Sequence, residues 1–167
     1  MEFDKFFQLL IGGVVVGSIY AMVALGYTMV YGILGIINFA HGEVMMIGAM
    51  VAMTVSAALL VAGLPVLVVL MLSMLAAMAV CMLLSYTMEK VAYRPLRNAP
   101  KLAPLITAIG LSFLIQAVAQ MIWGKSPRPF PELLPADRIV LFSDVGITMR
   151  EIVIVALSLI MCAGLLN

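Results

Sequence analysis

The sequence predicts an all-α, polytopic membrane protein with about five transmembrane helices. Apolar residues make up 65% of the chain and charged residues only 10%, against roughly half and a quarter in soluble domains. The apolar residues are also gathered into long runs, as membrane-spanning helices require. We therefore treat residues 1–167 as a single membrane domain. A polar interruption between the first two runs, at residues 31–43, is where function is first to be sought.

The helices follow from the length of each apolar run. A bilayer core about 30 Å thick needs roughly 20 helical residues to cross it. Five segments reach or approach that length: 7–30, 44–63, 65–88, 102–123 and 151–167. The last is short, so we expect the sequence to be cut within a fifth span, and we expect the Gly63–Pro65 turn to join the second and third helices as antiparallel neighbours.

The connection between the fourth and fifth runs has a different character. A proline-rich loop from Gly124 to Pro131 is followed by two short segments that predict a hairpin, with Asp144 and Gly146 as turn residues. We expect this small loop and hairpin to lie outside the cytoplasm.

The orientation of the helices in the membrane is predicted from the loops that carry Lys and Arg. Residues 89–101 carry four Lys or Arg and one acid, and short basic loops stay in the cytoplasm. This places the N-terminus and residues 124–150 outside and residues 31–43 near the inner face. The assignment assumes that 31–43 is a simple turn, since a re-entrant segment would reverse the N-terminal side.

The interruption itself holds the only histidine, His41, and the only acid between Lys5 and Glu89, which is Glu43. Ionisable groups are costly near lipid and are functional candidates there. One interpretation is a capped turn, with Asn38 capping the next helix and Glu43 near its positive end. The other puts Asn38, His41 or Glu43 on the substrate path or its gate, as in the broken helices of transporters.

Two other polar stripes are candidates for the same path. Tyr27 and Tyr31 continue a stripe on the first helix that begins with Gly13 and Gly17, where another helix can approach closely. Gln116 and Gln120 follow Ser112 at steps of four on the fourth helix. Helix packing with hydrogen bonds between helices is the simpler explanation of both stripes, and a polar path is the alternative.

Several kinds of chemistry are disfavoured. With one histidine and no His-Glu-x-x-His pattern, we expect no metal site, and no nucleophile–base pair indicates an enzyme. The Gly-Lys-Ser sequence at 124–126 lacks the first glycine of a phosphate-binding loop and is followed by Pro127, so we expect no cofactor and no ATP hydrolysis by this chain. The net charge of +1 argues against a nucleic-acid partner.

Five blocks, in order along the chain, closely resemble the N-terminal half of branched-chain amino acid ABC-transporter permeases of the smaller subunit type. They are GSIYA at 17–21, ALGYTMVYG at 24–32, INFAHG at 37–42, VAYRPLR at 91–97 and APLITAIG at 103–110. The resemblance covers the whole chain. It supplies no residue-by-residue ligand assignment, so the site candidates above rest on the physical argument alone.

The resemblance implies a permease subunit in a bacterial inner membrane. It implies a second homologous permease, two cytoplasmic ATPases that use ATP, and a periplasmic protein that delivers leucine, isoleucine or valine. Relatives carry urea or short amides, and a passive channel or scaffold subunit is a further alternative. Family members are longer than this chain, and the helix that docks on the ATPase follows the fifth span, so we expect the fragment to be inactive alone.

Overall fold

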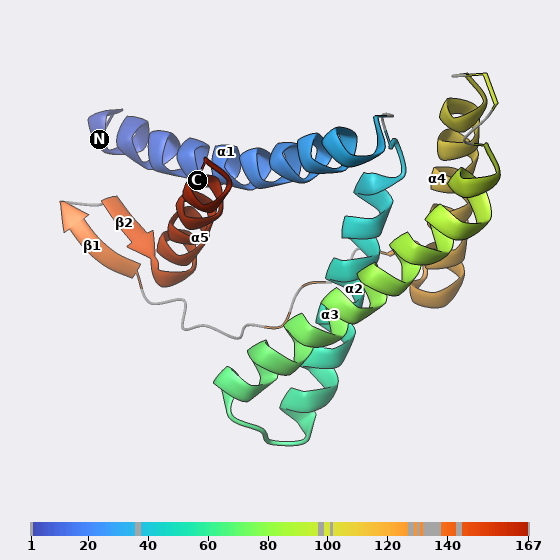
Figure 1. The fold of residues 1–167 in the computed structure, drawn as a ribbon. Helices are drawn as coiled ribbons and strands as arrows, with labels where there is room; N and C mark the ends of the chain where they lie inside the picture. Colours follow the sequence, from blue (N-terminus) through green and yellow to red (C-terminus); the bar gives the residue numbers. More distant parts are fainter. Residues whose placement is uncertain are drawn as a thin grey trace. The chain divides into compact units, whose positions relative to one another are not determined.

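The computed structural model describes residues 2–35, 38–96, 99–100, 102–126, 129, 131, 138–142 and 145–166. In these ranges the chain forms long helices and one hairpin, which confirms the all-α membrane class (Figure 1). The α-helices are α1 (Glu2–Leu34), α2 (His41–Val61), α3 (Val66–Met88), α4 (Leu102–Trp123) and α5 (Met149–Leu166). Two short helical segments, η1 (Glu89–Tyr93) and η2 (Arg94–Leu96), extend α3.

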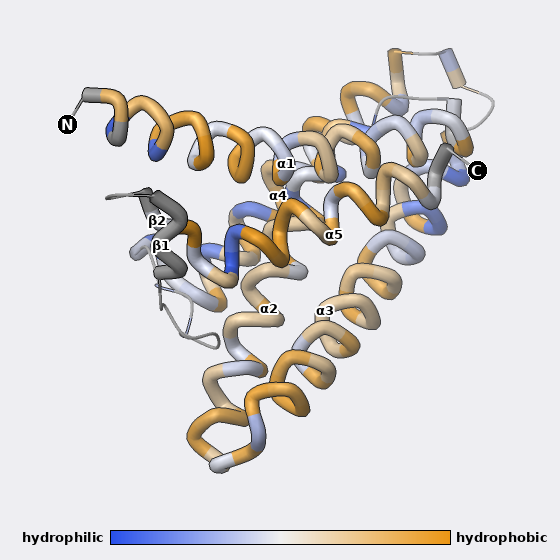
Figure 2. Tube along the Cα trace, turned by 90° about the vertical axis from the view of Figure 1, so that its left-hand side faces the viewer, coloured by the Kyte–Doolittle hydropathy of each residue, from blue (hydrophilic) through white to orange (hydrophobic). Residues whose placement is uncertain are grey.

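Four helical stretches of the described residues are long and apolar enough to cross a membrane: Lys5–Ile33, His41–Val61, Val66–Leu96 and Leu102–Trp123. Apolar residues run along nearly the whole of α2 and α3 (Figure 2). The fifth predicted segment is also a helix, α5, of 18 residues. The predicted order of helices is therefore confirmed.

The chain divides into two compact units, one made of residues 1–29 and 134–167 and the other of residues 30–133. In the second unit, α2 and α3 pack as an antiparallel pair, as the short turn between them predicted. Gly63 turns the chain with a φ of 74°, a conformation that favours glycine.

Helices α2 and α3 approach each other closely at Gly48. A Cβ placed on Gly48 would lie 2.7 Å from Sγ of Cys81, well inside van der Waals contact. The Cys81 thiol in turn donates a hydrogen bond to the Val44 carbonyl, 3.4 Å away. Glycine therefore lets the two helices approach closely, the role that small residues play between membrane helices.

The first unit contains the predicted hairpin. Strands β1 (Arg138–Phe142) and β2 (Val145–Thr148) are antiparallel, with Val140 opposite Gly146 and a register irregularity between Val140 and Phe142. Gly146 is part of β2, so its assignment to the turn was wrong, whereas Asp144 lies outside the described residues. The alternation of apolar residues located the hairpin but not the residues of its turn.

The outer edge of β2 is closed by a side chain of α1. The Gln8 amide donates from Nε2 to the Gly146 carbonyl at 3.2 Å and accepts at Oε1 from the Gly146 N–H at 3.3 Å. One side chain thus satisfies both backbone groups of a buried strand residue, as a neighbouring strand would.

We expect Gln8→Leu to expose this edge. The Gly146 N–H and carbonyl would lose their partner, at a cost of about 1–3 kcal/mol for each buried group left unpaired. Amide hydrogen exchange at Gly146 should become faster. Gln8→Glu keeps an acceptor for the Gly146 N–H and should slow exchange back toward the wild-type rate. Equal exchange in the wild type and in Gln8→Leu would contradict the contact.

Within its own compact unit, the glycine stripe of α1 has no close neighbour at Gly13 or Gly17. Apart from the nearby backbone of α1, no described atom of that unit lies within 4 Å of a Cβ built on either glycine. Both glycines are exposed. The close helix packing predicted for this stripe stays a prediction.

Candidate functional site

The chain enters α2 through a hydrogen-bonded turn at Asn38. Its Oδ1 accepts from the Ala40 N–H at 3.0 Å and from the Tyr93 hydroxyl at 2.7 Å, while its carbonyl accepts from the His41 N–H at 3.1 Å. Ala40, not Asn38, is the residue that caps α2, and it supplies no side-chain cap. Asn38 therefore shapes the turn before the helix and ties it to η1 through Tyr93.

Glu43, in the first turn of α2, reaches across to α4. Its Oε1 accepts hydrogen bonds from Gln116 Nε2 at 2.6 Å and from Ser112 Oγ at 3.0 Å. These three half-buried side chains form what we call the glutamate cluster. Ser112 and Gln116 are four residues apart, so both lie on the side of α4 that faces α2.

The glutamate cluster lies near the middle of α4. Ser112 is ten residues after Leu102, where α4 begins, and Gln116 is seven residues before Trp123, where it ends. At 1.5 Å per residue, the cluster is about 15 Å from one end and about 10 Å from the other.

A second contact shows how α2 runs beside α4. Further along α2, Thr54 Oγ1 accepts from Trp123 Nε1 at 2.8 Å. The two helices therefore run in the same direction, and α2 begins halfway along α4. The contact with α3 also places the start of α2 at the middle of a long helical stretch. Cys81, which donates to the Val44 carbonyl, is fifteen residues from each end of the Val66–Leu96 stretch.

This register places the beginning and the end of residues 38–43 at different levels along the neighbouring helices, whereas we had expected all of residues 31–43 near the inner face. Asn38 does lie near the end of the α3 extension, since Tyr93 is three residues from Leu96. Glu43, by contrast, lies level with the middle of a helix whose 22 residues match one membrane crossing. A simple turn would keep the whole stretch at one level, whereas α2 begins beside the middle of α4. The position of residues 31–43 relative to the inner face stays a prediction.

Among the described residues, two pockets adjoin the start of α2, and different predicted site residues line each of them. The histidine pocket, of about 310 Å³, is lined by Asn38, His41, Tyr86, Glu89 and Tyr93, among others. The glutamate pocket, of about 230 Å³, is lined by Glu43, Met46, Met50, Gln116, Ala119, Gln120 and Gly124. His41 and Glu43 are two residues apart, about 200° around the helix, so they point to different sides.

The structure thus brings together three of the predicted residues, Glu43, Gln116 and Gln120, and places Asn38 and His41 around a separate pocket. Tyr31 is 54% exposed and lines neither pocket. Tyr27 belongs to the other compact unit.

Tyr93 and the two methionines were missed as candidate residues. The polar residues of α4 that line the glutamate pocket were predicted, because Ser112, Gln116 and Gln120 recur at steps of four. No pattern marked Met46 and Met50 among fifteen methionines.

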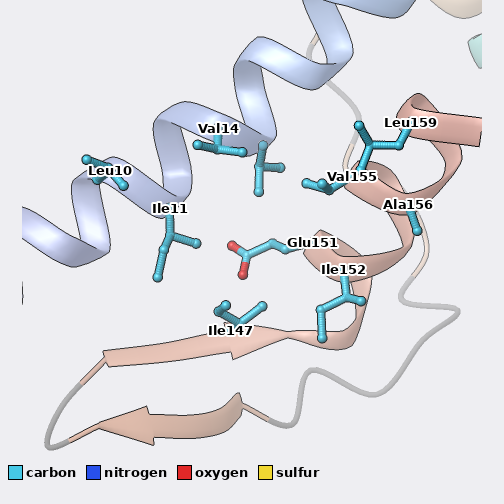
Figure 3. Close-up of a pocket in the computed structure, with 10 residues that line it drawn as sticks. Leu10, Ile11, Val14, Ile147, Glu151, Ile152, Val155, Ala156 and Leu159 are labelled. Atoms are coloured by element: carbon cyan, nitrogen blue, oxygen red, sulfur yellow. The ribbon is translucent and has the colours of Figure 1, made fainter. Parts of the chain in front are cut away.

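The first unit contains a larger pocket, of about 380 Å³, between α1, β2 and α5 (Figure 3). Its accessible surface is entirely apolar, from residues such as Ile11, Ile147 and Ile152. Glu151 points among them, but its Oε2 accepts from the Thr148 N–H at 2.8 Å, as in a helix capping box. We therefore assign Glu151 to the start of α5 and place the candidate site at the glutamate cluster.

Comparison with known proteins defines the class of molecule that carries this site. The family described as the branched-chain amino acid transport system permease component matches residues 9–167, and the chain belongs to this family. It is thus a multi-pass membrane protein of a transporter family, in agreement with its long apolar helices. No solved structure matches the chain significantly.

Individual relatives are similar over most of the chain. The high-affinity branched-chain amino acid transport system permease protein BraD of Pseudomonas aeruginosa is 40% identical over 98% of this chain and 55% of its own length. The permease proteins LivH of Salmonella typhimurium and Escherichia coli K12 are 41% and 40% identical, over 83% and 86% of this chain and 46% and 47% of their own lengths. The chain spans about half the length of the curated relatives it matches.

Proposed function

We propose that this chain belongs to the transmembrane permease subunit of an ATP-binding-cassette importer that takes up leucine, isoleucine and valine. The family membership and the names of the relatives support the substrate class. The observation that carries the role is the glutamate cluster, in which a carboxyl group and two polar side chains meet halfway along a membrane-length helix.

Polar side chains placed in the hydrocarbon core of a membrane have a high free energy. A carboxyl group and a glutamine at the depth of the hydrocarbon core are expensive, and such groups mark substrate or ion pathways. Glu43 also follows a break between α1 and α2, and backbone of this kind is tolerated at membrane depth where it is buried in protein or lines a cavity. We therefore propose that Glu43, Gln116 and Gln120 line the path of the amino acid, with Asn38 and His41 beside it.

The partners follow from the proposed role. The subunit would pair with a second homologous permease to form the path, with two cytoplasmic ATPases to drive it and a periplasmic binding protein to deliver the amino acid, all in or at the bacterial inner membrane. ATP would be used by the ATPases, so the chain itself needs no cofactor, no metal and no catalytic residues.

Uptake of labelled leucine into cells that express the permease with its transport system tests the proposal. We expect uptake that requires active ATPase subunits and is reduced by excess isoleucine or valine. Competition by urea or acetamide instead would assign the alternative substrate class. Leucine flux that is independent of the ATPases would indicate a passive channel and contradict the proposal.

A further inference from the structure

Within the part of the chain that the structure describes, only one of the two carboxyl oxygens of Glu43 accepts a hydrogen bond. The two hydrogen bonds from Ser112 and Gln116 both end on Oε1. Among the described residues, none donates a hydrogen bond to Oε2. In the same residues, every fully buried side-chain oxygen or nitrogen of a buried or half-buried residue has a hydrogen-bond partner. Since Oε2 has no partner among the described residues and is not fully buried, it is accessible, and Glu43 lines the glutamate pocket.

The rest of that pocket is suited to a small molecule with one cationic and one aliphatic end. Met46, Met50 and Ala119 provide apolar walls, and methionine adapts its shape to different aliphatic groups. Gln120 brings an amide that can donate or accept. The volume of about 230 Å³ lies below the roughly 300–1,000 Å³ of pockets for drug-sized ligands, so the pocket suits a smaller ligand.

The acidic side chain in the pocket favours a ligand with a positively charged group. Among the described residues that line it, Glu43 is the only ionisable group. A primary ammonium group at Oε2 would form a charge-assisted hydrogen bond, which is stronger than a neutral one. Ser112 and Gln116 would hold the carboxyl group in place from its other oxygen.

We propose that the glutamate pocket binds the α-ammonium group of the transported amino acid at Glu43 Oε2 and its aliphatic side chain against Met46, Met50 and Ala119. This inference rests on the proposed function and adds which residue recognises which part of the substrate.

A charge-selective labelling experiment tests it in the assembled transporter. Cys81→Ala and Cys162→Ala remove the native thiols, and Met50→Cys places a reporter on the pocket wall. The reporter is labelled with methanethiosulfonate ethylammonium or with methanethiosulfonate ethylsulfonate, in nanodiscs of phosphatidylglycerol. That lipid has no ammonium group, so a lipid headgroup cannot occupy the site.

We expect the ammonium reagent to react faster than the sulfonate, and the ratio of the two rates to fall about tenfold or more in Glu43→Gln. Glu43→Asp, which keeps the charge, should preserve much of the ratio. Glu89→Gln is the matched control, because Glu89 lines the histidine pocket instead, and it should leave the ratio unchanged. Leucine, added with ATP and the binding protein, should slow labelling of the reporter.

An unchanged ratio in Glu43→Gln, or no protection by leucine, would overturn the assignment, as would a reporter that neither reagent reaches. Leucine transport by the reporter variant is measured in the same preparation. Transport without charge selectivity rejects the ammonium site alone, whereas the absence of leucine transport in the wild type rejects the proposed function and this inference with it.

Discussion

Glu43→Ala is expected to lower leucine uptake at least tenfold while the permease still inserts into the membrane. The change removes the acceptor of two hydrogen bonds, at 2.6 Å from Gln116 and 3.0 Å from Ser112. Leaving these half-buried donors unpaired costs up to the roughly 1–3 kcal/mol of a fully buried donor, and a tenfold change in rate corresponds to about 1.4 kcal/mol. Uptake of labelled leucine, normalised to the amount of permease in the membrane, measures the effect.

Two further variants distinguish the contribution of the glutamate cluster to uptake from that of the histidine pocket. Ser112→Ala leaves the shorter hydrogen bond from Gln116 in place, so its effect on uptake should be smaller than that of Glu43→Ala. His41→Ala tests the other pocket, and we expect it also to lower uptake. Normal uptake by Glu43→Ala, at normal abundance, would mean that the glutamate cluster only joins α2 to α4.

Gly48→Ala is expected to destabilise the permease, and the sign of its effect should depend on Cys81. The new methyl group would lie 2.7 Å from the Cys81 sulfur, which must move away from the Val44 carbonyl. Overpacking of this kind costs about 1–3 kcal/mol. This outweighs the gain of about 1 kcal/mol that alanine brings over glycine inside a helix.

In a Cys81→Ala background the sulfur is absent, so Gly48→Ala should be neutral or stabilising. Thermal unfolding of the purified permease in detergent, followed by circular dichroism, measures both pairs of variants. Gly110→Ala is the control on α4, because a Cβ there meets no atom of the described residues within 4 Å apart from the nearby backbone of α4 itself. A loss of stability that is the same in both backgrounds would show that Gly48 does not owe its role to Cys81.

The helices and their order were predictable because the signal is local. A run of about 20 apolar residues must cross the bilayer as a helix whatever its neighbours are. Gly63 and Pro65 mark the turn between α2 and α3 in the same local way. The unusual polarity of residues 38–43 could also be read directly, since nearly every other residue around them is apolar.

The grouping of those polar residues needed the tertiary structure. Glu43 is 73 positions from Gln116 and 69 from Ser112. Which turn of α4 it meets depends on how far α2 is shifted along that helix, and the hydrogen bond between Trp123 and Thr54 records that shift. No local pattern encodes it.

By itself, the sequence determined a membrane protein of successive apolar helices with a polar break after the first, and its motifs pointed to the permease family that the comparisons show. Only the tertiary structure decided that His41 and Glu43 line different pockets and that Glu43 lies level with the middle of α4. The physical reason is that apolarity specifies which segments enter the bilayer, whereas close packing between helices specifies the depth at which their polar side chains meet.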